Sequence, residues 1–167
     1  KEKIVVMGGI WFVQGIQGNC HLGHMTIHGA NRCGVLGSSS FSMDDVLVKE
    51  CSLRGVYAWG RKGVGRCNDM EVRDCGKSGV GVTNNASVTL VGDTKVHDNC
   101  KNRKNGDYGL QIHGSSSATI QLVHPLTKNI VSTDNAGGGN WGAGGGNIDQ
   151  IKTIPKAYSD GDAVDAA

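Results

Sequence analysis

Apolar and polar side chains alternate in short runs, and these runs recur about every two dozen residues. The segment Val46–Cys51 matches Met70–Cys75 position by position, at a spacing of 24 residues. A third copy, Thr94–Cys100, has one extra residue before its cysteine, and an earlier copy begins at Met25. Alternation with a period of two places neighbouring side chains on opposite faces of an extended chain, so each run predicts a β-strand.

Two more runs follow within each repeat. The second run begins with a glycine and an aliphatic residue, in the copies Gly34-Val35, Gly55-Val56, Gly79-Val80 and Gly109-Leu110. The third run alternates like the first, in the copies Phe41–Met43, Val88–Leu90 and Ile120–Leu122. No segment combines a 3.6-residue period with helix caps, so the sequence predicts three short strands per repeat.

Short strands that recur at a fixed spacing can stack as successive coils of a solenoid. Corresponding strands then pair in parallel, about 4.8 Å apart. Alternate side chains form apolar columns inside and polar columns outside, with glycines and turn-forming residues at the corners. We therefore expect an all-β solenoid of about six coils with three short parallel sheets, stable only as a stack.

The repeat resembles that of right-handed parallel β-helix proteins of the pectin-lyase-like superfamily. The residues that carry the resemblance are Val46–Cys51, Met70–Val82 and Thr94–Cys100, with the glycine-led second runs. The resemblance implies a right-handed parallel β-helix. It implies little about function, because that fold hosts lyases, hydrolases, epimerases, viral adhesins and non-enzymatic repeat domains.

The repeats divide the chain into three parts. Residues 1–23 form an N-terminal coil or cap, in which we expect the aromatic pair Trp11 and Phe12 to be buried together. Residues 24–136 hold the regular coils. Residues 137–167 combine a glycine-rich last coil with a mobile acidic tail.

Two local irregularities stand out within the coils. Strict register in the coil after Gly55 would bury Arg66, which is costly for an unpaired charge. We therefore expect a shift that turns Cys67 inward and Arg66 outward. Residues 101–105 are an insertion that we expect to protrude as a basic loop.

Composition narrows the class of protein. The 167 residues fit one domain. Seventeen Lys and Arg against 15 Asp and Glu leave a net charge of +2, which argues against nucleic acid as a partner. No apolar stretch is long enough to span a membrane. The first residue is Lys rather than Met, so we expect a piece excised from a longer protein.

The six cysteines predict buried free thiols rather than disulfides. Cys51, Cys75 and Cys100 share one repeat position, and Cys33 is a plausible fourth member of the column. Side chains on stacked coils point in the same direction, which is poor geometry for a disulfide. Free thiols fit a reducing compartment slightly better than an oxidising one. No pair of cysteines has metal-ligand spacing, and we expect no metal site.

Outward positions of the first run form two polar columns. They are Thr26, Leu47, Glu71 and Lys95, and beside them His28, Lys49, Arg73 and His97. Since this sheet usually carries the active site in pectin-lyase-like enzymes, the resemblance nominates Glu71, Arg73, Lys95 and His97 as the centre of a site, with Lys49 beside them.

This charged face could perform chemistry or could be an ordinary solvated surface. In a uronate lyase or epimerase, Arg73 or Lys49 would pair with the sugar carboxylate, and Lys95 or His97 would act as base. A calcium-assisted version would need converging acidic oxygens, for which Glu71, Asp74 and Asp98 are candidates. Their spacing does not support calcium, so no cofactor is expected. Alternatively, the opposite charges pair across coils and serve only solubility and register.

Outward aromatic residues are the other candidate for recognition. Tyr57 and Trp59 alternate with inward Val56 and Ala58 on the second run, and Tyr108 borders the basic insertion. Exposed rings can stack on sugars or pack against a protein partner. Packing beneath a neighbouring loop is the plainer alternative.

These observations favour a non-enzymatic recognition or structural module, with a glycan or a protein as partner. Exposed strand edges at the ends of the stack invite a homo-oligomer or a larger assembly, such as a viral or cell-surface protein, which would lie outside the cell. Two alternatives stay open. One is a polysaccharide lyase or epimerase that acts on uronate polymers, and the other is an intracellular protein-recognition repeat domain.

Overall fold

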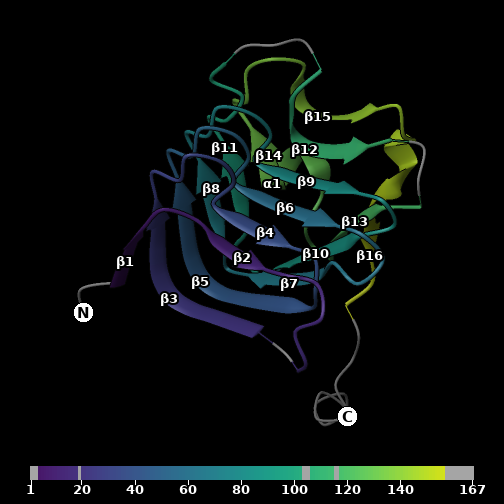
Figure 1. The fold of residues 1–167 in the computed structure, drawn as a ribbon. Coiled ribbons are helices and arrows are strands. Elements are labelled where there is room, and N and C mark those ends of the chain that lie inside the picture. The colour runs from purple at the N-terminus through teal and green to yellow at the C-terminus, as the bar shows by residue number, and fades with distance from the viewer. Residues whose placement is uncertain (1–3, 19, 103–105, 115–116, 157–167) are drawn as a thin grey trace, which may run out of the picture.

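The computed structural model describes residues 4–18, 20–102, 106–114 and 117–156. Within these residues, strands form two parallel sheets of ten and six strands, accompanied by one α-helix and one 3₁₀ helix (Figure 1). A mostly-β fold with parallel sheets is therefore confirmed.

The strands pair in three ladders, each of which collects one kind of run from successive repeats. The first ladder consists of β1 (Ile4–Met7), the second halves of β3 (Cys20–His28) and β5 (Phe41–Lys49), β8 (Glu71–Arg73), β11 (Lys95–His97) and β14 (Ser132–Thr133). The second ladder is the six-stranded sheet, with β2 (Ile10–Phe12), β4 (Val35–Gly37), β6 (Val56–Trp59), β9 (Val80–Thr83), β12 (Tyr108–His113) and β15 (Gly139–Gly144). The third ladder consists of the first halves of β3 and β5, β7 (Val64–Asn68), β10 (Ser87–Val91), β13 (Thr119–Val123) and β16 (Ile151–Ile154).

The structure has two sheets where three were expected. The long strands β3 and β5 continue through a corner and so join the first and third ladders into one ten-stranded sheet (Figure 1). They bend at His24 and Asp45, where φ is +53° and +50°. In the next repeat Asp69 has φ +49° at the same corner, and there the chain breaks into the separate strands β7 and β8.

The core lies between the sheets and is built from apolar columns. Val48, Val72 and Val96 are aligned on neighbouring strands and fully buried, which confirms the predicted register. The glycine-led run gives a second column in which Val56 lies against Val80. Burial of each valine contributes roughly 1.5–3 kcal/mol relative to exposure. Because each column needs its neighbours to be buried, the ladders stabilise one another.

A second corner follows the first ladder. Glu50, Asp74, Asp98 and Asp134 take this position in successive repeats, with φ between +53° and +58°. Asp tolerates this left-handed conformation better than most residues because its short polar side chain bonds locally. The acidic residues beside the charged face therefore have a conformational role at the turn.

The predictions for the register at Arg66 and for the aromatic pair Trp11 and Phe12 had different outcomes. Cys67 is fully buried and Arg66 exposed, so the predicted register shift is confirmed. The expectation that Trp11 and Phe12 are buried together is wrong. Phe12 points inward and stacks on Phe41 with ring centroids 5.6 Å apart, whereas Trp11 is 62 % exposed. Adjacent residues on a strand face opposite sides, so only one of the two can enter the core.

The predicted cysteine column is only partly correct. Cys51 and Cys75 occupy neighbouring positions, as expected. At the earlier position Ala30 replaces Cys33, since the amide of Ser52 bonds to Ala30 O as the amide of Gly76 bonds to Cys51 O. At the later position the extra residue, Asn99, takes the place expected for Cys100. Asn99 is fully buried and its Oδ1 accepts from the amide of Cys75, 3.1 Å away.

The glycine-rich C-terminal part is ordered into strands up to β16. The helix α1 (Lys128–Val131) precedes β14, and the 3₁₀ helix η1 (Ile148–Gln150) precedes β16. Neither was expected from the sequence, because each is only about one turn long and a single turn shows no repeating hydrophobic pattern. Residues 103–105 of the predicted basic loop and the whole predicted acidic tail, residues 159–167, lie outside the described residues.

Candidate functional site

The charged face has the register that the repeats predict. Leu47, Glu71 and Lys95 are aligned across β5, β8 and β11, and so are Lys49, Arg73 and His97. All five candidate residues of this face therefore lie on one surface of the first ladder.

Each of the four basic candidates contacts a carboxylate. Arg73 Nε lies 3.0 Å from Glu71 Oε1, and Arg73 Nη1 lies 2.6 Å from Asp74 Oδ2. The two ring nitrogens of His97 lie 3.3 Å from Glu71 and 2.7 Å from Asp98. Two further pairs complete the face: Lys49 lies 3.1 Å from Glu50, and Lys95 lies 3.3 Å from Asp93.

In these ion pairs, the side chains that catalysis would need are already bound to neighbouring carboxylates. Hydrogen bonding to Asp74 raises the pKa of Arg73. Burial alone would raise the pKa of Asp74, but hydrogen bonds from Arg73 and Lys101 outweigh it and lower that pKa. Both nitrogens of His97 face carboxylate oxygens, so neither faces outward toward a substrate proton. Of these pairs, only His97–Glu71 joins two strands. The others are local, as on an ordinary solvated surface, where each pair contributes little.

The carboxylates proposed as calcium ligands contact basic side chains. Glu71 is engaged by Arg73 and His97, and Asp98 is engaged by His97. Across the described residues, no three His, Cys, Asp or Glu side chains converge as metal ligands would. A hard cation would first have to displace the arginine and histidine from these oxygens.

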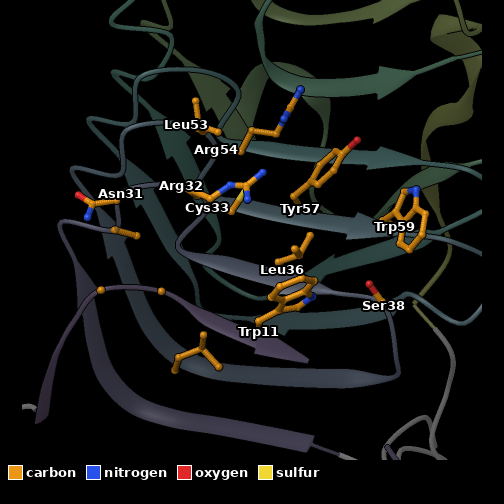
Figure 2. Close-up of a pocket in the computed structure, with 14 residues that line it drawn as sticks. Trp11, Asn31, Arg32, Cys33, Leu36, Ser38, Leu53, Arg54, Tyr57 and Trp59 are labelled. Atoms are coloured by element: carbon orange, nitrogen blue, oxygen red, sulfur yellow. The ribbon is translucent and has the colours of Figure 1, made fainter. Parts of the chain in front are cut away.

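A pocket of about 610 Å³ lies over the outer face of the second ladder. Figure 2 shows Trp11, Leu36 and Tyr57 following one another across β2, β4 and β6, with Trp59 at the far end of β6. Trp11 is 62 % exposed and Trp59 44 % exposed. The volume and the mixture of apolar walls with a few polar groups are typical of small-molecule sites.

Tyr57 is held in place from two sides. The guanidinium carbon of Arg54 lies 4.4 Å from the centre of its ring, and the His113 ring meets it edge-on with centroids 5.7 Å apart. On the neighbouring strand Gly81 leaves room for the ring, since a Cβ there would lie 3.1 Å from Tyr57 Cδ2. Burial raises the pKa of Tyr57, so its hydroxyl remains a hydrogen-bond donor at neutral pH.

His113 gives a pH-dependent prediction. Burial, with smaller effects of the charges on Arg54 and Lys77, lowers its pKa from 6.5 to about 4. Between these values the unfolded chain binds a proton that the folded chain does not, so the free energy of unfolding falls as the pH drops from 6.5 toward 4. We expect His113→Phe to remove about 1.5 kcal/mol of this loss between pH 7 and pH 4.5, after allowance for partial solvent exposure.

Urea unfolding of the wild-type chain and His113→Phe at both pH values measures this difference. The phenyl ring keeps the edge-on contact with Tyr57, so the variant separates titration from packing. Equal losses in the two chains would show that His113 does not titrate as its burial requires.

The sequence predicted only part of the pocket. Tyr57 and Trp59 were identified as outward aromatic residues, and Val56 and Ala58 beneath them are fully buried as expected. Trp11, Leu36, Arg32 and Arg54 were missed. The repeat register could have predicted Trp11 and Leu36, because both align with Tyr57 in one outward column.

Two of the buried cysteines, Cys67 and Cys100, act as small apolar side chains. All six cysteines of the chain are free. Burial raises the pKa of Cys67 to about 12, and burial together with Asp107 raises the pKa of Cys100 to about 12. A thiol that remains protonated is a poor nucleophile and a poor metal ligand. These two side chains therefore contribute packing rather than reactivity.

Comparison with protein-family models, with curated proteins and with solved structures found no match. The resemblance to the pectin-lyase-like superfamily therefore remains an expectation that rests on the repeat. None of the helices in the described part of the chain has the length and apolar character needed to cross a bilayer.

Proposed function

We propose that this chain is a non-enzymatic recognition module, built as a right-handed parallel β-helix of about six coils, which binds carbohydrate in the aromatic pocket. Three parallel ladders of six strands, with aligned residues separated by roughly one repeat, support the β-helix. A rigid stack of this kind presents a pocket whose walls need not order on binding.

The observation that carries the proposal is the exposure of indole rings in a concave site. Trp11 and Trp59 keep 62 % and 44 % of their surface exposed. Tyr57, two residues before Trp59 on β6, is held in place by Arg54 and His113. Sugars have apolar C–H faces as well as hydroxyls, so they fit flat aromatic walls that have polar groups at the rim. Pre-positioned rings bind such a face without a large cost in side-chain entropy.

Trp11→Ala should weaken glycan binding about thirtyfold, the effect of losing a central aromatic contact of about 2 kcal/mol. Trp11 is exposed, so we expect the fold to survive the change. The measurement is a glycan array followed by titration of the best ligand. Ile130→Ala, which removes another exposed apolar side chain far from the pocket, is the matched control and should bind as the wild type does.

Two outcomes would contradict the proposal. One is an array on which no glycan binds, and the other is a Trp11→Ala variant that binds its ligand as tightly as the control. Incubation with pectate and alginate, with absorbance of an unsaturated product as readout, tests the alternative of a lyase, which the paired charged face makes unfavourable.

A second candidate, a protein-recognition domain within a larger assembly, is favoured by the apolar N-terminal edge. β1 pairs only with β3 and β2 only with β4 among the described strands. Ile4 and Met7 on β1 are 67 % and 70 % exposed. Open strand edges with apolar side chains are prone to pair with other chains. A solution mass that shows a stable oligomer would support this candidate.

A further inference from the structure

The aromatic pocket has two guanidinium groups and no carboxylate. Arg32 precedes β4 and Arg54 precedes β6, and both line the pocket. None of the 14 lining residues is acidic. Figure 2 shows the Arg32 side chain extending along the pocket toward Tyr57. The pocket thus combines an aromatic wall with positive charge.

These arginines differ from the basic residues of the charged face. There, Lys49, Arg73 and Lys95 each have a carboxylate within 3.3 Å. For Arg32 and Arg54, the described residues supply no ion pair. The Nε of Arg54 is also buried without a hydrogen-bond partner. A buried donor without a partner is uncommon in folded proteins.

We infer that the pocket binds an acidic saccharide, whose ring lies on the aromatic wall while its carboxylate or sulfate group contacts Arg32 and Arg54. This inference rests on the proposed function and specifies the class of sugar.

The chemistry favours an anionic ligand over a neutral one. A guanidinium group presents paired N–H donors that match the oxygens of a carboxylate or sulfate, and such charge-assisted bonds are about twice as strong as neutral ones. Arg54 is already positioned by its stacking on Tyr57, which lowers the entropy that binding must overcome. The apolar wall excludes water from one side and so strengthens the pairing.

Two matched pairs of probes test the inference by calorimetric titration. The first pair is hexagalacturonate and its methyl ester, which share a backbone but differ in charge. The second pair is a heparin-derived hexasaccharide and its desulfated form. We expect the acidic member of at least one pair to bind about tenfold or more tightly than its partner, with an affinity that falls as salt is added. The pair that shows the larger ratio identifies the anionic group.

Arg32→Gln should then reduce the affinity for the acidic probe about tenfold more than it reduces the affinity for the neutral partner. Arg32 is exposed and makes no ion pair in the described structure, so the variant should fold normally. Arg66→Gln, which removes an exposed arginine from β7, is the control and should bind both probes as the wild type does.

The outcomes separate this inference from the proposed function. Equal binding of acidic and neutral partners, or selectivity that survives Arg32→Gln, overturns the inference and leaves the carbohydrate site standing. If none of the four probes binds but neutral glycans bind on the array, the inference is likewise overturned and the carbohydrate site stands. Failure of all four probes and of every glycan on the array overturns both.

Discussion

Replacing Asn99 by leucine should destabilise the chain by about 4 kcal/mol, one of the two largest effects that we expect. Asn99 is fully buried, and its side chain bonds to three backbone groups in two successive repeats. Its Nδ2 donates to the carbonyls of Val72 and His97, at 3.0 Å and 2.9 Å, and its Oδ1 accepts from the amide of Cys75. Leucine has the same number of side-chain heavy atoms and the same branching at Cγ, but it leaves these backbone groups without partners.

The same arrangement recurs one repeat later. Asn135 Nδ2 donates to the carbonyls of Val96 and Thr133, at 3.0 Å and 2.8 Å, and its Oδ1 accepts from the amide of Asn99. The two asparagines therefore supply hydrogen-bond partners to backbone groups at this corner, where pairing between strands does not supply them. Removal of one side chain also removes a bond that orders the other, so the effects of Asn99→Leu and Asn135→Leu should not be additive.

Urea unfolding followed by circular dichroism measures the effect of Asn99→Leu. Asn129→Leu, an exposed position on α1, is the control and should change the stability by less than about 0.5 kcal/mol. A loss below about 1 kcal/mol for Asn99→Leu would show that water or relaxation satisfies the backbone groups, and the proposed role of the asparagine column would be wrong.

The second large effect concerns a glycine at the start of a second run. In Gly55→Ala the new Cβ would overlap Val72 Cγ1 and lie 2.7 Å from the carbonyl oxygen of Gly79. The valine is fully buried and the oxygen belongs to the backbone, so neither can move away easily. We expect a loss of about 3 kcal/mol.

Gly144→Ala provides the matched comparison, because its Cβ would meet only Gln111 Nε2, at 3.5 Å. Thermal unfolding of both variants and the wild type measures the difference. If both glycine variants lost the same small amount, the close approach of the second ladder to the Val72 column would be contradicted. Gly34 has the same environment one repeat earlier, where a Cβ would lie 2.9 Å from the carbonyl oxygen of Gly55.

The repeat spacing was sufficient to predict most of the register. Val48, Val72 and Val96 recur at 24-residue intervals, and an apolar residue that returns to the same face must pack on its predecessor. The register shift at Arg66 followed from the cost of burying a charge. The fusion of two ladders into one sheet did not follow, because it depends on whether a residue such as Asp45 or Asp69 bends or breaks a strand.

Other features depend on contacts that spacing does not specify. The extra residue before Cys100 could be accommodated in two ways, and only the structure shows that Asn99 enters the core. The charged face was located correctly, but the pairing of its charges depends on rotamers. The aromatic pocket depends on Arg32 and Arg54, which lie in corners between strands, where the period of two no longer places a side chain.

Hydrogen exchange, measured with and without a glycan that binds on the array, tests most directly whether recognition takes place at the aromatic pocket. The account predicts slower exchange on binding in the segments that carry Arg32 and Arg54 and along β2, β4 and β6, with no change at β8 and β11. Protection centred on β8 and β11, around Arg73 and His97, would place the ligand on the charged face and contradict it.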